Sequence, residues 1–165
     1  REVNKVREEA FQRLKNHNKA QDDYTEAIEF DPKIGDDYLN RGTTLEALKK
    51  YRAALDDYGE AIEHDPNNAT AYNRLGRMLA ECPDGELRNG KKAVEFAKKA
   101  CELDGKKVNH LATLAAAYAE SGNFEEAVKW QRKALDMPDG YSNKNKEWAT
   151  QVLALYQHGK PYHRK

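Results

Sequence analysis

The chain has 165 residues, the size of one ordinary domain, and its 28 lysines and arginines balance its 28 aspartates and glutamates. This balance argues against a nucleic-acid-binding protein, which normally carries a basic excess. No apolar run approaches the roughly 20 residues that a membrane-spanning helix needs. No secretory leader opens the sequence, and because it begins with Arg1 rather than methionine we expect a fragment or a processed form.

Four similar segments follow one another along the chain. Their equivalent alanines, Ala20, Ala54, Ala93 and Ala127, recur at intervals of 34, 39 and 34 residues. A period of about 34 residues with paired helical patterns is typical of a helix–turn–helix solenoid. The sequence therefore predicts one all-α domain, residues 1–165, folded as a right-handed superhelix of four antiparallel helix pairs.

The first repeat, residues 1–34, aligns with the second at a constant offset of 34 positions. It is therefore predicted to form two helices. Asn4 and Glu8, however, stand where the second repeat has Tyr38 and Gly42. Polar residues on the packing face predict an atypical repeat, one that caps the array or has lost its neighbour.

The second repeat, residues 35–68, shows the pattern most clearly. Tyr38, Gly42 and Leu45 are spaced by four and three residues and so share one face of a helix. Gly42 lowers helix propensity, which indicates a close approach to a second helix. That helix carries a small, aromatic and small trio: Ala54, Tyr58 and Ala61.

The third repeat, residues 69–107, carries five extra residues in the segment CPDGELRNG, whose proline and two glycines predict a loop or short turn. In the fourth repeat, residues 108–141, Gly122 is predicted to stop one helix and Asn123 to cap the next. Residues 143–157 predict an unpaired amphipathic helix that covers the end of the array. Residues 158–165 form a basic tail without periodicity.

The sequence lacks the patterns of catalytic, nucleotide or metal sites. HExxH, a glycine-rich phosphate loop and GxSxG are absent, so we expect no cofactor and no metal. Cys82 and Cys101 fall about 15 Å apart on the expected hairpin, beyond disulfide reach. They are predicted to be free thiols, which favours a cytoplasmic location.

These features resemble the tetratricopeptide repeat (TPR) family over residues 1 to about 137. The matching elements are an aromatic residue followed by glycine in the first helix, the small–aromatic–small trio in the second, and a closing proline: Tyr38 and Gly42, Tyr72 and Gly76, Ala54, Tyr58 and Ala61, Pro32 and Pro66. The segment from Gly90 to Trp130 also looks like bacterial members. The resemblance implies a non-enzymatic scaffold that binds a peptide segment of a partner protein in a concave groove, with no role for nucleic acid or membrane.

In this family the first helix of each repeat lines the groove. Carried over by register, the groove residues would be Lys5, Leu39, Asn40, Thr43, Glu46, Asn73, Arg74, Arg77, Glu81, Asn109, Ala112, Thr113, Ala116 and Glu120. The amides suit the backbone of an extended segment, and Arg74 and Arg77 suit an acidic side chain.

Chaperone-binding members carry a clamp for the carboxylates of a peptide C-terminus. Lys5, Asn40 and Arg74 match that clamp. Glu9 and Thr70 replace its asparagine and lysine, and Glu9 would repel a carboxylate. The clamp is therefore partial, and the same residues also suit a solvated helix face.

Two alternatives to peptide binding remain at this point. Self-association through the atypical first repeat is one, because open ends of solenoids can stack or swap. Catalysis is the weaker alternative, since its best carboxylate pair, Asp56 and Asp57, consists of adjacent residues that point to different sides of a helix.

Overall fold

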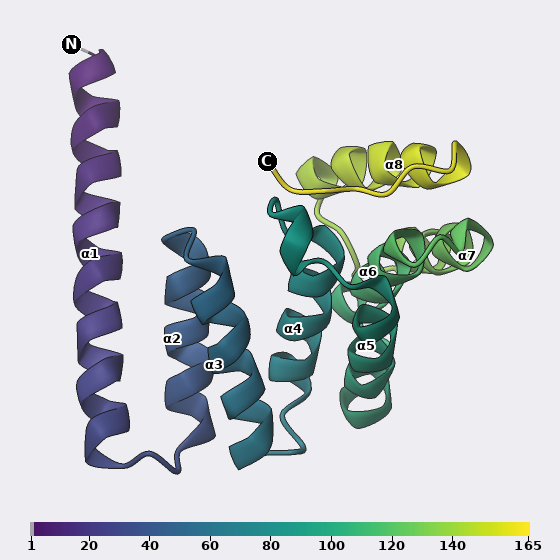
Figure 1. Cartoon of the computed structure of the whole chain (residues 1–165). Coiled ribbons are helices and arrows are strands. Elements are labelled where there is room, and N and C mark those ends of the chain that lie inside the picture. The colour runs from purple at the N-terminus through teal and green to yellow at the C-terminus, as the bar shows by residue number, and fades with distance from the viewer. Residues whose placement is uncertain (1) are drawn as a thin grey trace. The chain divides into compact units, whose positions relative to one another are not determined.

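The computed structural model describes the backbone of residues 2–165 and the side chains from residue 7 onward. The described residues form helices and turns without a strand. The chain divides into two compact units, Arg1–Pro66 and Asn67–Lys165 (Figure 1). Cys82 and Cys101 both belong to the second unit, and neither forms a disulfide bond.

The first unit contains helices α1 (Glu2–Phe30), α2 (Gly35–Ala47) and α3 (Tyr51–His64). Helices α2 and α3 form the hairpin expected from the second repeat. A Cβ atom added at Gly42 would lie 2.7 Å from the ring of Tyr58, so only glycine allows this approach of α2 to α3. The Tyr58 ring is fully buried as a result.

Helix α1 departs from the expected hairpin of the first repeat, because residues 2–30 form one continuous helix (Figure 1). Residues 12–19 contain neither glycine nor proline, so nothing in the sequence stops the helix there. Glu8 also occupies the position that corresponds to Gly42. In a closed hairpin the Glu8 side chain would face Tyr24, just as a Cβ atom at Gly42 would meet Tyr58, so position 8 disfavours the hairpin.

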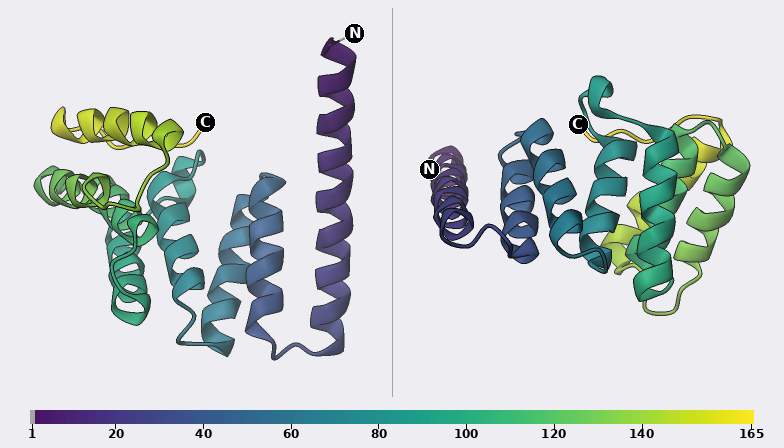
Figure 2. Two further views of the ribbon diagram at one scale, coloured as in Figure 1. Left: turned by 180° about the vertical axis from the view of Figure 1, so that it is seen from behind. Right: turned by 60° about the horizontal axis from the view of Figure 1, so that its bottom comes forward.

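The second unit holds two antiparallel helix pairs and a final helix (Figure 2). Its elements are α4 (Ala69–Glu81), the short 3-10 helix η1 (Gly85–Leu87), α5 (Gly90–Asp104), α6 (Val108–Glu120), α7 (Phe124–Leu135) and α8 (Asn143–Gln157). The five inserted residues thus fall within the α4–α5 connection, residues 82–89, which contains η1.

Polar side chains mark the start of several of these helices. Asn68, Asn89 and Asn123 each accept a hydrogen bond from the first turn of α4, α5 and α7 respectively. Gly122 adopts a positive φ of 85° at the α6–α7 turn, a conformation that side chains rarely allow. The predicted stop at Gly122 and cap at Asn123 are therefore confirmed.

Helix α8 packs against α7, and its apolar face closes the core of the second unit. Val152 and Tyr156 are buried against alanines of α6 and α7. The side chain of Gln131 is also buried, and its amide donates a 3.0 Å hydrogen bond to the carbonyl of Ala149 in α8. This bond satisfies a polar group inside the core and holds α8 in register on α7.

Candidate functional site

The surface formed by α4 and α6 contains two adjoining pockets, which share Arg77 and Asn109. The aromatic pocket has a volume of about 400 Å³. Its aromatic wall comprises Tyr141, Trp148, Tyr156 and Tyr162. The polar pocket has a volume of about 250 Å³, and its remaining lining residues are Thr70, Asn73, Arg74, Asp104, Lys107 and His110.

The aromatic wall is assembled by α8 and by the chain on either side of it. Tyr156 lies on the buried face of α8, and desolvation raises the pKa of its hydroxyl. Trp148 lies on the same helix, and the ring of Tyr162 meets it edge-on with centroids 5.5 Å apart. Tyr141, from the α7–α8 connection, completes the wall.

The basic tail is ordered along the rim of the aromatic pocket. In Figure 1 it runs back beside α8 toward the end of α4. The backbone N–H of Arg164 donates to the carbonyl of Glu81 at 2.9 Å, and its guanidinium contacts the sulfur of Met78. His163 Nε2 lies 2.6 Å from a carboxylate oxygen of Glu120. These contacts hold Tyr162 in place as part of the pocket wall.

The polar pocket carries an excess of positive charge. Arg77 pairs with the buried carboxylate of Glu81 at 3.2 Å, and Lys107 pairs with Asp104 at 2.6 Å. No carboxylate in the described part of the chain pairs with the half-buried Arg74. Arg74 is thus the cation of this pocket that forms no ion pair within the described residues.

Two buried polar atoms on the lining of the pockets lack hydrogen bonds of ordinary geometry within the described residues. They are the side-chain oxygen of Asn73 and the hydroxyl of Tyr141, which still interacts with the buried side chain of Gln131. Burial raises the pKa of Tyr141, so the hydroxyl keeps its proton and can donate. An unsatisfied buried group costs about 1–3 kcal/mol, and a ligand group that bonds to it recovers part of that cost.

The structure brings together the groove residues predicted in the second unit. Asn73, Arg74, Arg77, Glu81, Asn109, Ala112 and Thr113 all line the two pockets. Ala116 and Glu120 do not line them. Ala116 is buried in the core, and Glu120 is engaged by Arg88 at 3.1 Å and by His163.

The groove residues predicted in the first unit lie on α2. Asn40 is exposed there, Leu39 and Thr43 are half-buried, and the Thr43 hydroxyl donates to the carbonyl of Leu39. The carboxylate of Glu46 accepts a 2.8 Å hydrogen bond from the Tyr58 hydroxyl and so supports the α2–α3 hairpin. The side chain of Lys5 lies outside the described residues. Of the partial clamp pattern, only Arg74 and Thr70 meet in one pocket.

Sequence reasoning missed the aromatic wall and Gln131. Trp148, Tyr156 and Val152 were recognisable as one face of the last helix, but a capping face is expected to be covered. Nothing in the helical period indicates that Tyr141 and Tyr162, which lie outside helices, return to that face. The excess of tyrosine in the last 25 residues is the signal that could have drawn attention to them.

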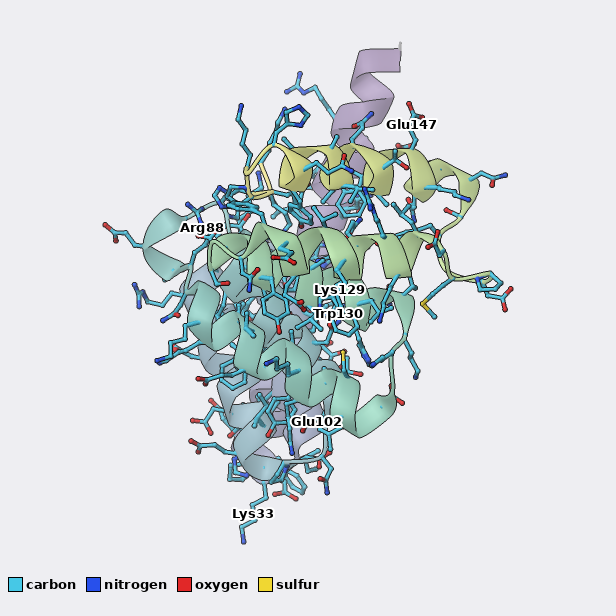
Figure 3. The ribbon with its side chains drawn as sticks, turned by 90° about the vertical axis from the view of Figure 1, so that its right-hand side faces the viewer. Lys33, Arg88, Glu102, Lys129, Trp130 and Glu147 are labelled. Atoms are coloured by element: carbon cyan, nitrogen blue, oxygen red, sulfur yellow. The ribbon has the colours of Figure 1, made fainter. Side chains whose placement is uncertain are left out.

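A second surface gathers cations on α7, outside both pockets. Figure 3 shows Lys129 and Trp130 on the same side of this helix. The amino groups of Lys106, Lys129 and Lys133 lie 4.6–5.1 Å from the centre of the Trp130 ring. Glu126 accepts hydrogen bonds from Lys129 and from the Trp130 indole, so this cluster is partly neutralised within the helix.

Three other features of the described residues concern a metal site, a membrane-spanning helix and the predicted carboxylate pair. They contain no cluster of three or more histidine, cysteine, aspartate or glutamate side chains placed to hold a metal ion. None of their helices is long and apolar enough to cross a membrane. Asp57 is buried and accepts two hydrogen bonds from Arg41 at 2.7 and 2.8 Å, while Asp56 is exposed.

Three segments of the chain match models of the tetratricopeptide repeat. They are residues 9–34, 36–68 and 108–137, together more than half of the sequence. The chain belongs to the tetratricopeptide repeat family. The match at residues 9–34 covers α1 from residue 9 to its end and the turn that follows, so the first TPR repeat has the family's sequence pattern in a continuous helix.

Solved TPR structures share this fold. A crystal structure of MamA superposes with a TM-score of 0.63 at 24% identity, over 73% of this chain and 63% of MamA. YrrB, described as a TPR protein with an unusual peptide-binding site, superposes with a TM-score of 0.62 at 19% identity, over 81% of this chain and 66% of YrrB. This TPR chain therefore spans less than two thirds of the protein chain in either of these two crystal structures. No curated protein matches the sequence.

Proposed function

We propose that this TPR chain is a protein-interaction scaffold that holds an extended segment of a partner protein against the α4–α6 surface. The observation that carries the proposal is the pair of adjoining pockets lined by the first helices of two successive repeats. Such surfaces are the usual binding faces of stacked helical repeats. The peptide-binding site described for YrrB, which shares only the fold, is consistent with this use.

The polar groups on this surface suit the main chain of an extended segment. The unpartnered oxygen of Asn73 can accept from a backbone N–H, and Asn109 offers both a donor and acceptors. Arg74 adds a cation without a partner within the described part of the chain. The residues predicted on α2, namely Leu39, Asn40 and Thr43, are proposed as a separate binding surface of the first unit.

Selection from a displayed library of random peptides tests the proposal. We expect binders whose affinity falls at least about tenfold on the double change Asn73→Ala and Arg74→Ala, as when central interface residues are truncated. Arg77 is left unchanged because it pairs with the buried Glu81. The matched control changes Lys91 and Lys92, which are exposed on α5, to alanine.

Peptides that bind both variants equally would move the binding site away from α4 and α6. Absence of any binder would contradict the proposed function.

Self-association is a second candidate, favoured by the open face of α1. Phe11 and Leu14 are spaced by three residues on this helix, and 59% and 52% of their surfaces are exposed. A second copy could cover them. Light scattering of the separated protein should then show a mass that rises with concentration and returns to the monomer value on changing both residues to glutamate. A monomer at all concentrations would remove this candidate.

A catalytic role has no comparable support. Asp57, the better-placed member of the predicted carboxylate pair, is held by Arg41 inside the first unit. Its charge raises the pKa of the Arg41 guanidinium through the hydrogen bonds between them. The pair stabilises a contact between α2 and α3, which is a structural use of the carboxylate.

A further inference from the structure

We propose that the bound segment carries an aromatic side chain, which enters the aromatic pocket, and a nearby acidic side chain, which pairs with Arg74. This inference rests on the proposed function and adds the chemistry of the ligand. It follows from the difference between the two adjoining pockets, one walled by aromatic rings and the other positively charged.

The aromatic pocket has the size of a site for a side-chain anchor, with aromatic rings along one wall and polar side chains such as Asn109 and Thr113 along another. Its volume of about 400 Å³ falls within the ~300–1,000 Å³ typical of ligand pockets. Trp148 and Tyr162 already meet edge-on, and an incoming ring can join them in the same geometry. The buried hydroxyl of Tyr141 supplies a donor for a carbonyl or hydroxyl of the ligand.

The charges of the surface select the sign of the second side chain. Glu81, the acidic group of the aromatic pocket, is engaged by Arg77 at 3.2 Å and approached by Arg164 at 3.7 Å. A cationic ligand would therefore face two arginines that compete for one carboxylate. Arg74 has no such partner within the described residues, so an acidic ligand group gains an attraction that costs no existing ion pair.

The two pockets share Arg77 and Asn109, so one continuous segment can occupy both. The probes are twelve-residue peptides with acetylated and amidated ends, built from glycine, serine and asparagine with one phenylalanine and one glutamate. One to six residues separate these two positions across the set. Blocked ends keep a terminal carboxylate from contributing. Matched peptides replace phenylalanine by serine or glutamate by lysine.

The readout uses the two tryptophans of the chain. In a Trp130→Phe variant, fluorescence reports Trp148 in the pocket wall. In a Trp148→Phe variant, it reports Trp130, which lines neither pocket. We expect at least one spacing to bind and to change the emission of the first variant only. Both the serine and the lysine peptides should bind at least about tenfold more weakly.

Two substitutions separate the parts of the site. Arg74→Glu should reverse the preference, so that the lysine peptide binds better than the glutamate peptide. Ala112→Phe, which adds a ring inside the aromatic pocket, should abolish binding, whereas Ala154→Phe on the exposed side of α8 should not. Circular dichroism of each variant checks that the helices are retained.

The outcomes distinguish this inference from the proposed function. If library peptides bind through Asn73 and Arg74 but need no aromatic residue and leave Trp148 emission unchanged, the scaffold proposal stands and the aromatic-anchor inference is overturned. If the Arg74→Glu variant still prefers the glutamate peptide to the lysine peptide, the proposed pairing of Arg74 with an acidic side chain is overturned. If no peptide depends on this surface, both proposals fail.

Discussion

At the scale of single residues, the closest helix contacts depend on the missing side chain of glycine. Gly90 begins α5 beside the end of α6, and a Cβ atom built there would lie 2.4 Å from the backbone nitrogen of Ser121. Backbone atoms cannot move aside as the end of a side chain can. Gly59, by contrast, lies within α3 with nothing within 4 Å of its added Cβ.

The two glycines should therefore respond to alanine with opposite signs. Gly90→Ala is expected to lower the free energy of unfolding by about 1–3 kcal/mol through overpacking. Gly59→Ala should raise the free energy of unfolding by about 0.5–1 kcal/mol, because alanine favours a helix and its methyl group meets no neighbouring atom. Urea denaturation of both variants measures the difference. Equal effects would show that α5 does not approach α6 this closely.

At the scale of elements, α1 shows how one position changes a repeat. Phe11 and Leu45 are equivalent in the 34-residue register, yet Phe11 is 59% exposed and Leu45 only 5%. The difference follows from the continuous helix, which carries Phe11 away from the partner that a hairpin would supply. Two large apolar side chains at equivalent positions, Phe11 and Leu45, are therefore expected to contribute differently to the free energy of unfolding.

Truncation of these two residues tests the opened repeat. Leu45→Ala should cost about 2–5 kcal/mol of stability, as for other buried leucines. Phe11→Ala should change stability by no more than about 0.5 kcal/mol, since an exposed side chain loses little on truncation. Denaturation midpoints compare the two. A large loss at Phe11 would mean that the first repeat closes into a hairpin in solution.

The helical period predicted the elements well and their connections less well. The α2–α3 hairpin, the glycine contact at Gly42 and the turn at Gly122 follow directly from residue spacing and local conformation. The continuity of α1 does not, because a repeat pattern records which residues face a partner but not whether the partner helix folds back. Glu8, which stands where the second repeat has Gly42, was the residue in the sequence that indicated a departure from the hairpin.

For the candidate site, the repeat register predicted that residues of α4 and α6 share one surface, but it did not predict the aromatic wall. Helical spacing relates residues within one helix or in equivalent helices. Tyr141 and Tyr162 reach the aromatic pocket through a connection and a tail, whose paths depend on tertiary hydrogen bonds such as Arg164 to Glu81. Such paths leave no periodic trace.

At the scale of the whole molecule, the two units are expected to unfold in separate steps. Both tryptophans, Trp130 and Trp148, belong to the second unit, whereas helices of both units contribute to circular dichroism. Exposed side chains on α1 leave the first unit less apolar burial. Helical signal should therefore begin to fall at lower urea than tryptophan emission changes. Coincident curves would indicate a single cooperative transition.

The ordered tail also fixes the position of residues 162–165 beside the aromatic pocket. Because Arg164 is hydrogen-bonded to the end of α4, anything joined after Lys165 starts beside the rim of the aromatic pocket. A peptide fused at that point through a short linker would be held near the pocket at a high effective concentration. A labelling enzyme fused there would sit over whatever the pocket holds, whereas a bulky purification tag would crowd its entrance.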